Sequence, residues 1–450
     1  MTQTLNTMSA GTLDPTFGEG GILRNFPEIS GYDMAAVLAL PEKKLLVVIP
    51  LLGDDALFVV ARLNENGTLD GTFGERQTGF VEVALKEARL AKVIGLRELN
   101  DGGWLILAEY QSTSSGDYGL LLVRQFANGR LDTSFGEEGS RYIPYKRLGG
   151  TEYQVVPQSA AERDEKSTFS SEPQIIRNSV NFAVQQSDNK IVLVSNVWDA
   201  SGKAKGIVLR LNSNGSDDQT FNSSGFAIVE LESIPNTANH GSVVAVQKDG
   251  KVLVGGYYSG ASPSPRGAYL IRFDAAGHVD RSFNAGAVVT IPNDSLIDLA
   301  AISIRDSDGK IVVVGYAVRD SVINGLIAVL NDSGSPNLLF NGGKPLCSPV
   351  VSEGLRWWRC ASPADGSIVV VGTTRLGANN AEHSAVTARY LPDGSLDPAF
   401  NGKGFTVFNE DEAFESAQDM AVMEDGRIIV CGIFSKDFEL RGGWALRYLS

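Results

Sequence analysis

Short apolar runs rich in Val, Ile and Leu recur along the chain, and turn residues bound each of them. An early set reads "DMAAVLAL", "KLLVVIP" and "LFVVARLN", and a later set reads "GSVVAVQ", "KVLVGGYY" and "AYLIRFD". Runs of this length and composition predict β-strands. The first and second runs of a set are joined by turns such as "KDGK", "SDGK", "ADGS" and "EDGR", which are typical of tight hairpins. Because no amphipathic helix of normal length is indicated, the pattern predicts an all-β protein.

A glycine-led motif follows the third run of each set and defines a period. It appears as "GTLDPTFGEGG", "GTLDGTFGERQTG", "GRLDTSFGEEG", "GSDDQTFNSSG", "GHVDRSFNAG", "GSPNLLFNGG" and "GSLDPAFNGKG". Neighbouring motifs start 56 to 62 residues apart, except for one gap of 86 residues between the third and the fourth. A fixed period of this size indicates an architecture in which each repeat is one supersecondary unit.

The phase of the repeat favours a closed ring. Each unit has three apolar runs and a fourth after the motif, which predicts a four-stranded antiparallel meander. The chain begins with a motif and the run "GILRNF", and it ends with "GGWALRYLS", the run that elsewhere precedes a motif. The two incomplete ends together make one unit, whereas an open solenoid would need capping repeats. We therefore predict a seven-bladed β-propeller of four-stranded antiparallel blades, closed by the N-terminal strand 21–26, which completes the last blade.

This interpretation makes residues 1–450 a single domain. Residues 1–10 form an N-terminal tail ahead of the first motif. The polar stretch 146–174 accounts for the long gap between motifs, so we predict an inserted loop between blades two and three.

Three side chains recur at fixed places in the repeats. An Arg in the third run stands eight residues before an Asp of the motif, and where one is missing the other is missing too: Val329 and Asn337 occupy the two positions in one repeat. We predict a bidentate Arg–carboxylate pair within or between blades. A Phe three residues after the Asp recurs in all seven motifs and should fill the space between blades. Seven equivalent acidic metal sites are the alternative, but one Asp beside an Arg is a poor cation cage.

The motif resembles a known family. "LDPTFGEGG", "LDGTFGE" and "LDTSFGEEG", each followed further along by text like "DGKIVVVG", resemble bacterial delta-60 repeats. The resemblance covers nearly the whole chain and implies a β-propeller. It implies no established activity, and no functional residue follows from it.

Composition narrows the partners. The formal net charge is −14, which argues against nucleic acid or an anionic membrane as a partner. No apolar stretch is long enough to span a membrane, and no basic segment followed by an apolar run marks a secretory signal. We expect a soluble cytoplasmic monomer, with signal-less secretion as the other route. Three cysteines argue against a disulfide scaffold, and Cys431 is expected to be a buried apolar residue.

The loops that do not repeat lie on one face of the predicted ring. The Asp-Gly hairpins and the motif turns share the opposite face, so binding is expected on the variable loops. The candidate binding residues there are Glu109, Tyr110, Asp117, Trp198, Asp199, Tyr257, Tyr258, Arg266, Arg319, Asp320, Arg375 and His383.

Catalytic motifs are weak in this sequence. No GxSxG, P-loop or CxxC occurs, His278 lies in a motif turn, and His240 and His383 stand alone in loops without metal-ligand spacing. We assign no catalytic residue, metal or cofactor. The leading hypothesis is a non-enzymatic scaffold that binds a protein or other macromolecule. An enzyme, a hydrolase or lyase at the channel mouth, and a carbohydrate-binding propeller remain alternatives.

Overall fold

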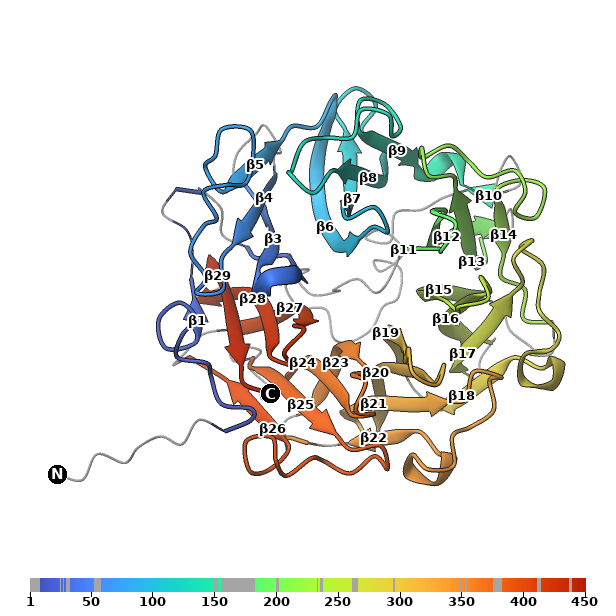
Figure 1. Cartoon of the computed structure of the whole chain (residues 1–450). Helices are drawn as coiled ribbons and strands as arrows, with labels where there is room; N and C mark the ends of the chain where they lie inside the picture. The colour runs from blue at the N-terminus through green and yellow to red at the C-terminus, as the bar shows by residue number, and fades with distance from the viewer. Residues whose placement is uncertain are drawn as a thin grey trace.

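The computed structural model shows a ring of β-sheets. It describes residues 9–24, 26, 28–29, 33–51, 58–148, 153–154, 183–199, 202–232, 234, 238–260, 266–293, 296–348, 350–352, 354–374, 383–410, 414–436 and 439–450. Within these residues the strands form seven antiparallel sheets, which we number as blades 1 to 7 in chain order. Figure 1 shows the sheets around a central axis, with β15 and β19 near the centre and β18 and β22 at the rim.

The first strand of each blade is the innermost. Blade 1 contains β2 (Ala36–Ala39), β3 (Leu45–Pro50), β4 (Phe58–Leu63) and β5 (Phe80–Val83), and blade 2 contains β6 (Ala88–Glu98), β7 (Trp104–Ser112), β8 (Tyr118–Gln125) and β9 (Ser140–Pro144). Blade 3 has β12 (Ile191–Asp199), β13 (Ala204–Leu211) and β14 (Phe226–Ile228), with β10 (Tyr153–Gln154) and β11 (Ala183–Gln185) both paired to β12.

The remaining blades repeat this order. Blade 4 is β15 (Ala238–Val246), β16 (Val252–Ser259), β17 (Arg266–Phe273) and β18 (Val289–Asn293), and blade 5 is β19 (Ile297–Ile304), β20 (Ile311–Arg319), β21 (Val322–Leu330) and β22 (Leu346–Ser348). Blade 6 is β23 (Leu355–Ala361), β24 (Ile368–Thr374), β25 (Ala385–Tyr390) and β26 (Phe405–Phe408). Blade 7 is β27 (Phe414–Val422), β28 (Ile428–Lys436) and β29 (Glu439–Tyr448), completed by β1 (Ile22–Leu23).

The seven-bladed propeller and its closure are confirmed. In β1, Ile22 pairs with Leu446 and Leu23 with Ala445, and the blue β1 lies beside the red β29 in Figure 1. The described residues contain no α-helix, only the 3₁₀ turns η1 (Pro41–Lys43), η2 (Tyr145–Arg147), η3 (Phe283–Gly286) and η4 (Asn341–Gly343). Most of the predicted insert 146–174, and residues 1–8 of the tail, lie outside the described residues.

The motif Phe fills the seam between blades, as predicted. Each of the seven is at most 2% exposed, and each packs on the leading glycine of the next motif: Phe17, Phe73, Phe135, Phe221, Phe283, Phe340 and Phe400. A Cβ at Gly129 would lie 2.6 Å from the Phe73 ring, and φ there is +86°. The motif needs glycine at this position because the ring of the preceding blade takes the space of a side chain.

The motif Arg of blades 1 to 4 and of blade 7 joins its blade to the next. In blade 3, Arg210 donates from Nε to Asp218 Oδ2 at 2.6 Å and from Nη2 to Thr220 Oγ1 at 3.1 Å. Its Nη1 donates at 2.5 Å to the backbone carbonyl of Ala275 in blade 4. The guanidinium carbon lies 4.6 Å from the centre of the Phe221 ring, which adds a cation–π contact. The predicted Arg–Asp pair is therefore present, but the prediction of bidentate geometry was wrong, because Nη2 bonds the neighbouring hydroxyl.

The second carboxylate oxygen of the motif Asp holds the turn. In the closing blade, Asp14 Oδ1 accepts the backbone N–H of Thr16 at 3.0 Å and its hydroxyl at 2.7 Å. Burial alone would raise the pKa of Asp14, but these bonds, a bond from Arg427 and the charge of Arg447 lower the pKa to about 2. The carboxylate therefore stays ionised in the closure.

Blade 5 keeps the seam without the ion pair. Val329 replaces the Arg, and Asn337 keeps the turn by accepting the backbone N–H of Leu339 at 3.2 Å. Phe340 still packs on Gly394, and Asn341 still donates its backbone N–H to the carbonyl of Asp393 at 2.9 Å. The neutral amide is understandable, because a carboxylate buried here without its Arg would be costly.

We expect Arg210→Met to lower the free energy of unfolding by about 3 kcal/mol, because it leaves the carboxylate of Asp218 buried with a weaker partner. The loss should fall at the lower end for such a pair, since Lys190 Nζ lies 3.1 Å from Asp218 Oδ2. Urea unfolding measures the change. Arg281→Met is the matched control, because that side chain is 75% exposed in the same kind of motif. Equal losses in both variants would contradict the assignment.

Candidate functional site

The two faces of the ring differ in how their polar groups are used. The motif face carries the Asp-Gly turns and the motif turns, and the variable face carries the turns from each second strand to the third and from each blade to the next. Eleven of the twelve candidate residues lie in described residues of blades 2 to 6, and Arg375 lies outside them. The described candidates stand at the variable-face ends of strands or in the adjoining turns.

The blade 2 candidates are engaged within the blade. Tyr110 is 4% exposed and packs edge-on against Tyr142, with ring centres 5.0 Å apart. Glu109 accepts the hydroxyl of Tyr145, and burial together with the charge of Glu109 holds the pKa of that Tyr well above its ordinary value. Asp117 accepts Lys146 in the turn before β8. These contacts explain the residues as parts of the blade.

Three aromatic side chains meet between blades 3 and 4, and we call them the aromatic cluster: Trp198, His240 and Tyr257. The His240 ring on β15 stacks on Tyr257 of β16, with centres 4.5 Å apart and planes 13° apart. Trp198 on β12 meets His240 at 74°, with centres 6.1 Å apart. All three residues are half-buried, and each stands at the variable-face end of its strand. Two of the predicted residues thus meet through a histidine that the sequence marks only as an isolated loop residue, but that belongs to an inner strand.

Two buried asparagines fix the strands that carry the aromatic cluster. Asn196 of blade 3 accepts the backbone N–H of Gly241 at 2.8 Å and donates to the carbonyl of the same residue at 3.1 Å. Asn239 of blade 4 accepts the N–H of Gly206 at 2.9 Å and donates to the carbonyl of Val229 at 3.2 Å. Because each pair of bonds crosses the seam, the relative position of the two blades is set beside the aromatic rings.

The other candidates do not join the aromatic cluster. Tyr258 is 4% exposed and belongs to the core, and Asp199 accepts the backbone N–H of Lys203 in its turn at 3.0 Å. Arg266 is exposed at the start of β17. Arg319 and Asp320 are exposed at the β20–β21 turn, where Asp320 has φ of +50°. His383 lies against Phe414, with ring centres 4.2 Å apart.

Charged side chains also line the inner strands. Arg359 of β23 donates from Nε to Asp419 Oδ1 of β27 at 2.8 Å, and the backbone N–H of Val37 donates to Asp419 Oδ2 at 3.2 Å. This ion pair joins blades 6 and 7 to blade 1 inside the ring, where both side chains are at most 8% exposed.

Two carboxyl groups near these strands have pKa values close to neutrality. Burial raises the pKa of Glu415 to about 7, and the negative charge of Glu410 contributes to this rise. The backbone N–H of Glu410 and the charge of Arg24 act in the opposite direction. Burial likewise raises the pKa of Asp33 to about 7, against the charge of Lys92. Glu415 Oε2 and Asp33 Oδ1 are buried and have no hydrogen-bond partner among the described residues. Shifts of this kind gather at functional sites, although structural burial causes them too.

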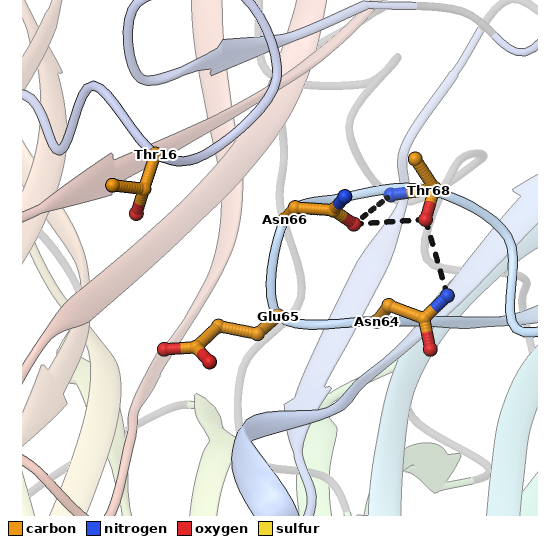
Figure 2. A pocket seen from close by; sticks show the side chains of 5 residues that line it. All are labelled: Thr16, Asn64, Glu65, Asn66 and Thr68. Carbon is orange, nitrogen blue, oxygen red and sulfur yellow. Dashed lines mark hydrogen bonds between the residues drawn. The ribbon is translucent and has the colours of Figure 1, made fainter.

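A hollow of about 450 Å³ lies on the motif face at the closure, lined by Thr16, Asn64, Glu65, Asn66 and Thr68. Figure 2 shows the last four on one turn, with Asn66 accepting the backbone N–H and the hydroxyl of Thr68 at 3.1 and 2.8 Å. Glu65 is held by Arg427 Nη2 at 2.7 Å, and Thr16 accepts Arg447 Nη2 at 2.8 Å. We assign the hollow to the closure, because its polar groups already serve the ring.

Other site types find little support in the described part of the chain. No group of three or more His, Cys, Asp or Glu residues there is arranged to hold a metal ion. No helix among the described residues has the length and apolar character needed to cross a bilayer. All three cysteines are free, and Cys431 is fully buried, as expected.

The raised pKa of Glu415 predicts a pH-dependent effect of Glu415→Gln. The folded pKa lies above the ordinary 4.5, so this group's contribution to stability is complete below about pH 4.5 and is lost as pH rises to about 7. We expect the variant to melt at a higher temperature than the wild type at pH 8 and at the same temperature at pH 4.5. Glu65→Gln is the control of opposite sign, because bonds from Arg427 and Lys43 lower the pKa of Glu65. A stabilisation of Glu415→Gln that is equal at both pH values would contradict the shift.

Comparison with known proteins agrees with the fold. Residues 56–73, 186–221, 247–283 and 364–400 match a family described as "Domain of unknown function (DUF5122) beta-propeller". No curated protein matches. Similar solved structures include a PL25 polysaccharide lyase, an ulvan lyase, at 12% identity and TM-score 0.48, covering 95% of this chain and 96% of that one. A protein of unknown function from Dyadobacter fermentans has 12% identity and TM-score 0.39, covering 81% and 100%.

A third similar structure is the β-propeller domain of the Trilobed protease from Pyrococcus furiosus. It has 9% identity and TM-score 0.42, covering 92% of this chain and 94% of that domain. At these identities and scores the solved structures carry no argument about what this chain binds. The family match and the seven sheets of Figure 1 together identify the chain as a β-propeller.

Proposed function

We propose that this chain is a non-enzymatic binding module that engages a macromolecular partner through its variable face, with the aromatic cluster as the main contact. The observation that carries the proposal is the half-buried group of Trp198, His240 and Tyr257, built from two blades and held by buried asparagines. Trp and Tyr are enriched among the residues that dominate binding energy. Non-repeating loops on a rigid scaffold supply the surroundings of such a contact.

The hydrogen bonds on the motif face also favour the variable face as the binding surface. The motif Arg side chains bond the Asp and the Thr or Ser of the same blade. In blades 3 and 4 they also donate to a backbone carbonyl of the next blade, so little of this polar chemistry is left for a ligand. The motif itself supports placing the chain among the delta-60 repeat propellers. We further propose that the chain acts as a monomer in the cytoplasm, with signal-less export as the other route.

The test is capture from a lysate of the source organism on immobilised chain. We expect Trp198→Ala with Tyr257→Ala to retain about tenfold less of the captured material than the wild type, as for other aromatic contacts of this kind. His278→Ala is the matched control on the motif face, where that side chain is 66% exposed, and it should retain as much as the wild type. Circular dichroism establishes that all variants are folded. Equal capture by the double variant, or a loss in the control alone, would reject the variable face.

A hydrolase or lyase at the channel mouth is the second candidate. The observation in its favour is that two separate buried carboxyls, those of Asp33 and Glu415, each have a pKa of about 7, where a group can both give and take a proton at neutral pH. Turnover in a hydrolase and lyase screen that disappears in Glu415→Gln would favour this function. Turnover that persists in both Glu415→Gln and Asp33→Asn would show that these carboxyls do not take part in catalysis, and the enzyme hypothesis would lose its support.

A further inference from the structure

We infer that the aromatic cluster is a subsite for an uncharged sugar ring. The inference rests on the proposed function, because it names the chemical class of the partner at the same place. A sugar ring has one face of polarised C–H bonds and a rim of hydroxyl groups. It therefore needs an aromatic plane below the ring and both donors and acceptors around it.

The rings provide such a plane. An aromatic face carries partial negative charge, which attracts the polarised C–H face of a sugar. The rings of His240 and Tyr257 stack face to face, so the stack presents its outer aromatic face, and Trp198 meets His240 at a steep angle and adds a second aromatic surface. Of the five tryptophans, only Trp198 is half-buried. The other four are at most 5% exposed.

The support beneath the rings is rigid. Asn196 and Asn239 join the strands that carry the rings, and the backbones are so close that a Cβ at Gly206 would lie 3.0 Å from the nitrogen of Gly241. A sugar offers little apolar area, so a site that needs no rearrangement loses less affinity to ordering. The seam between blades 3 and 4 meets this condition.

Polar residues adjoin the aromatic cluster in sequence. Ser242, two residues after His240, donates to Asp298 Oδ1 at 3.0 Å, and Asp199 directly follows Trp198. Carboxylates and hydroxyls are suitable partners for sugar hydroxyls. These acids and the net charge of −14 disfavour a polyanionic sugar, so the inferred ligand is uncharged.

The surroundings favour a sugar over a protein partner. The core of a protein interface is apolar beyond its aromatic anchors. Among the described residues, the exposed large hydrophobic side chains lie away from the aromatic cluster, in other blades or on the motif face: Phe126, Val279, Leu296, Val322, Leu338, Leu339 and Val407. An isolated aromatic spot with polar neighbours in sequence matches a sugar subsite better than the centre of a protein interface.

The test is to titrate the full chain with cellotetraose, xylotetraose, mannotetraose and tetragalacturonate. Calorimetry and tryptophan fluorescence measure the binding. We expect at least one of the three uncharged tetrasaccharides to bind saturably below about 10 mM, a range typical of weak ligand contacts, and to change the fluorescence of Trp198. Tetragalacturonate should bind more weakly than the best uncharged probe. Trp198→Ala and Tyr257→Ala should each weaken binding about tenfold or more.

Two control variants separate a stacking role from a loss of structure. Trp198→Phe and Tyr257→Phe keep an aromatic face and should retain most of the affinity, and His278→Ala should bind like the wild type. Failure of all three uncharged probes, preference for tetragalacturonate, or binding that survives Trp198→Ala would overturn the inference. If no sugar binds while lysate capture still depends on Trp198 and Tyr257, the proposed function stands and the sugar assignment fails. If neither experiment depends on these residues, both fail.

Discussion

The contact between one blade's motif Phe and the next blade's leading glycine is the constraint on which this propeller depends. The contact occurs at every seam, including the closure, where Phe400 packs on Gly11. The propeller closes only if each blade has the correct rotation and distance relative to the next. A Phe side chain packed directly on a glycine backbone sets that distance. The Arg–Asp pair then ties the same two blades through a backbone carbonyl, as Arg272 does with Asp332 at 2.8 Å. The inner ion pair of Arg359 and Asp419 adds a link on the channel side.

Blade 5 shows which contacts the seam requires and which only strengthen it. It keeps the Phe–Gly contact and the backbone bond across the seam, but it has neither the Arg nor the carboxylate. Leu338 and Leu339, exposed at 77% and 72%, stand where other motifs place a small or polar residue before the Phe. Losing both charges together is less costly than losing one, because a lone buried carboxylate has no counter-ion. Packing therefore defines the blade geometry, and the ion pair strengthens it.

The sequence predicted the fold because the fold is repeated. Seven copies of one motif compare the same position in seven environments, so the roles of Arg210, Asp218 and Phe221 were visible without a structure. The same logic fails for a site that occurs once. Trp198 and Tyr257 were predicted as binding residues with Tyr110 and Tyr258, which are buried, because periodicity does not tell which loop residues meet across a seam. His240 had no recognisable spacing, and its role depends on the asparagines that position β15 beside β12.

The closure has a consequence for how the molecule comes into being. Asp14 and Arg447 form an ion pair 2.8 Å long between residues 433 positions apart in the chain. Because a ribosome makes proteins from the N-terminus, the first strand must wait, without its partner, until β29 has been made. Bringing such distant segments together costs loop entropy that no earlier blade can repay, so ring closure is expected to be the slow event in folding. After β29 has been made and before β1 pairs with it, the edge of β29 exposes unpaired backbone groups that a strand of another chain could bind, so correct assembly requires that β1 pairs first.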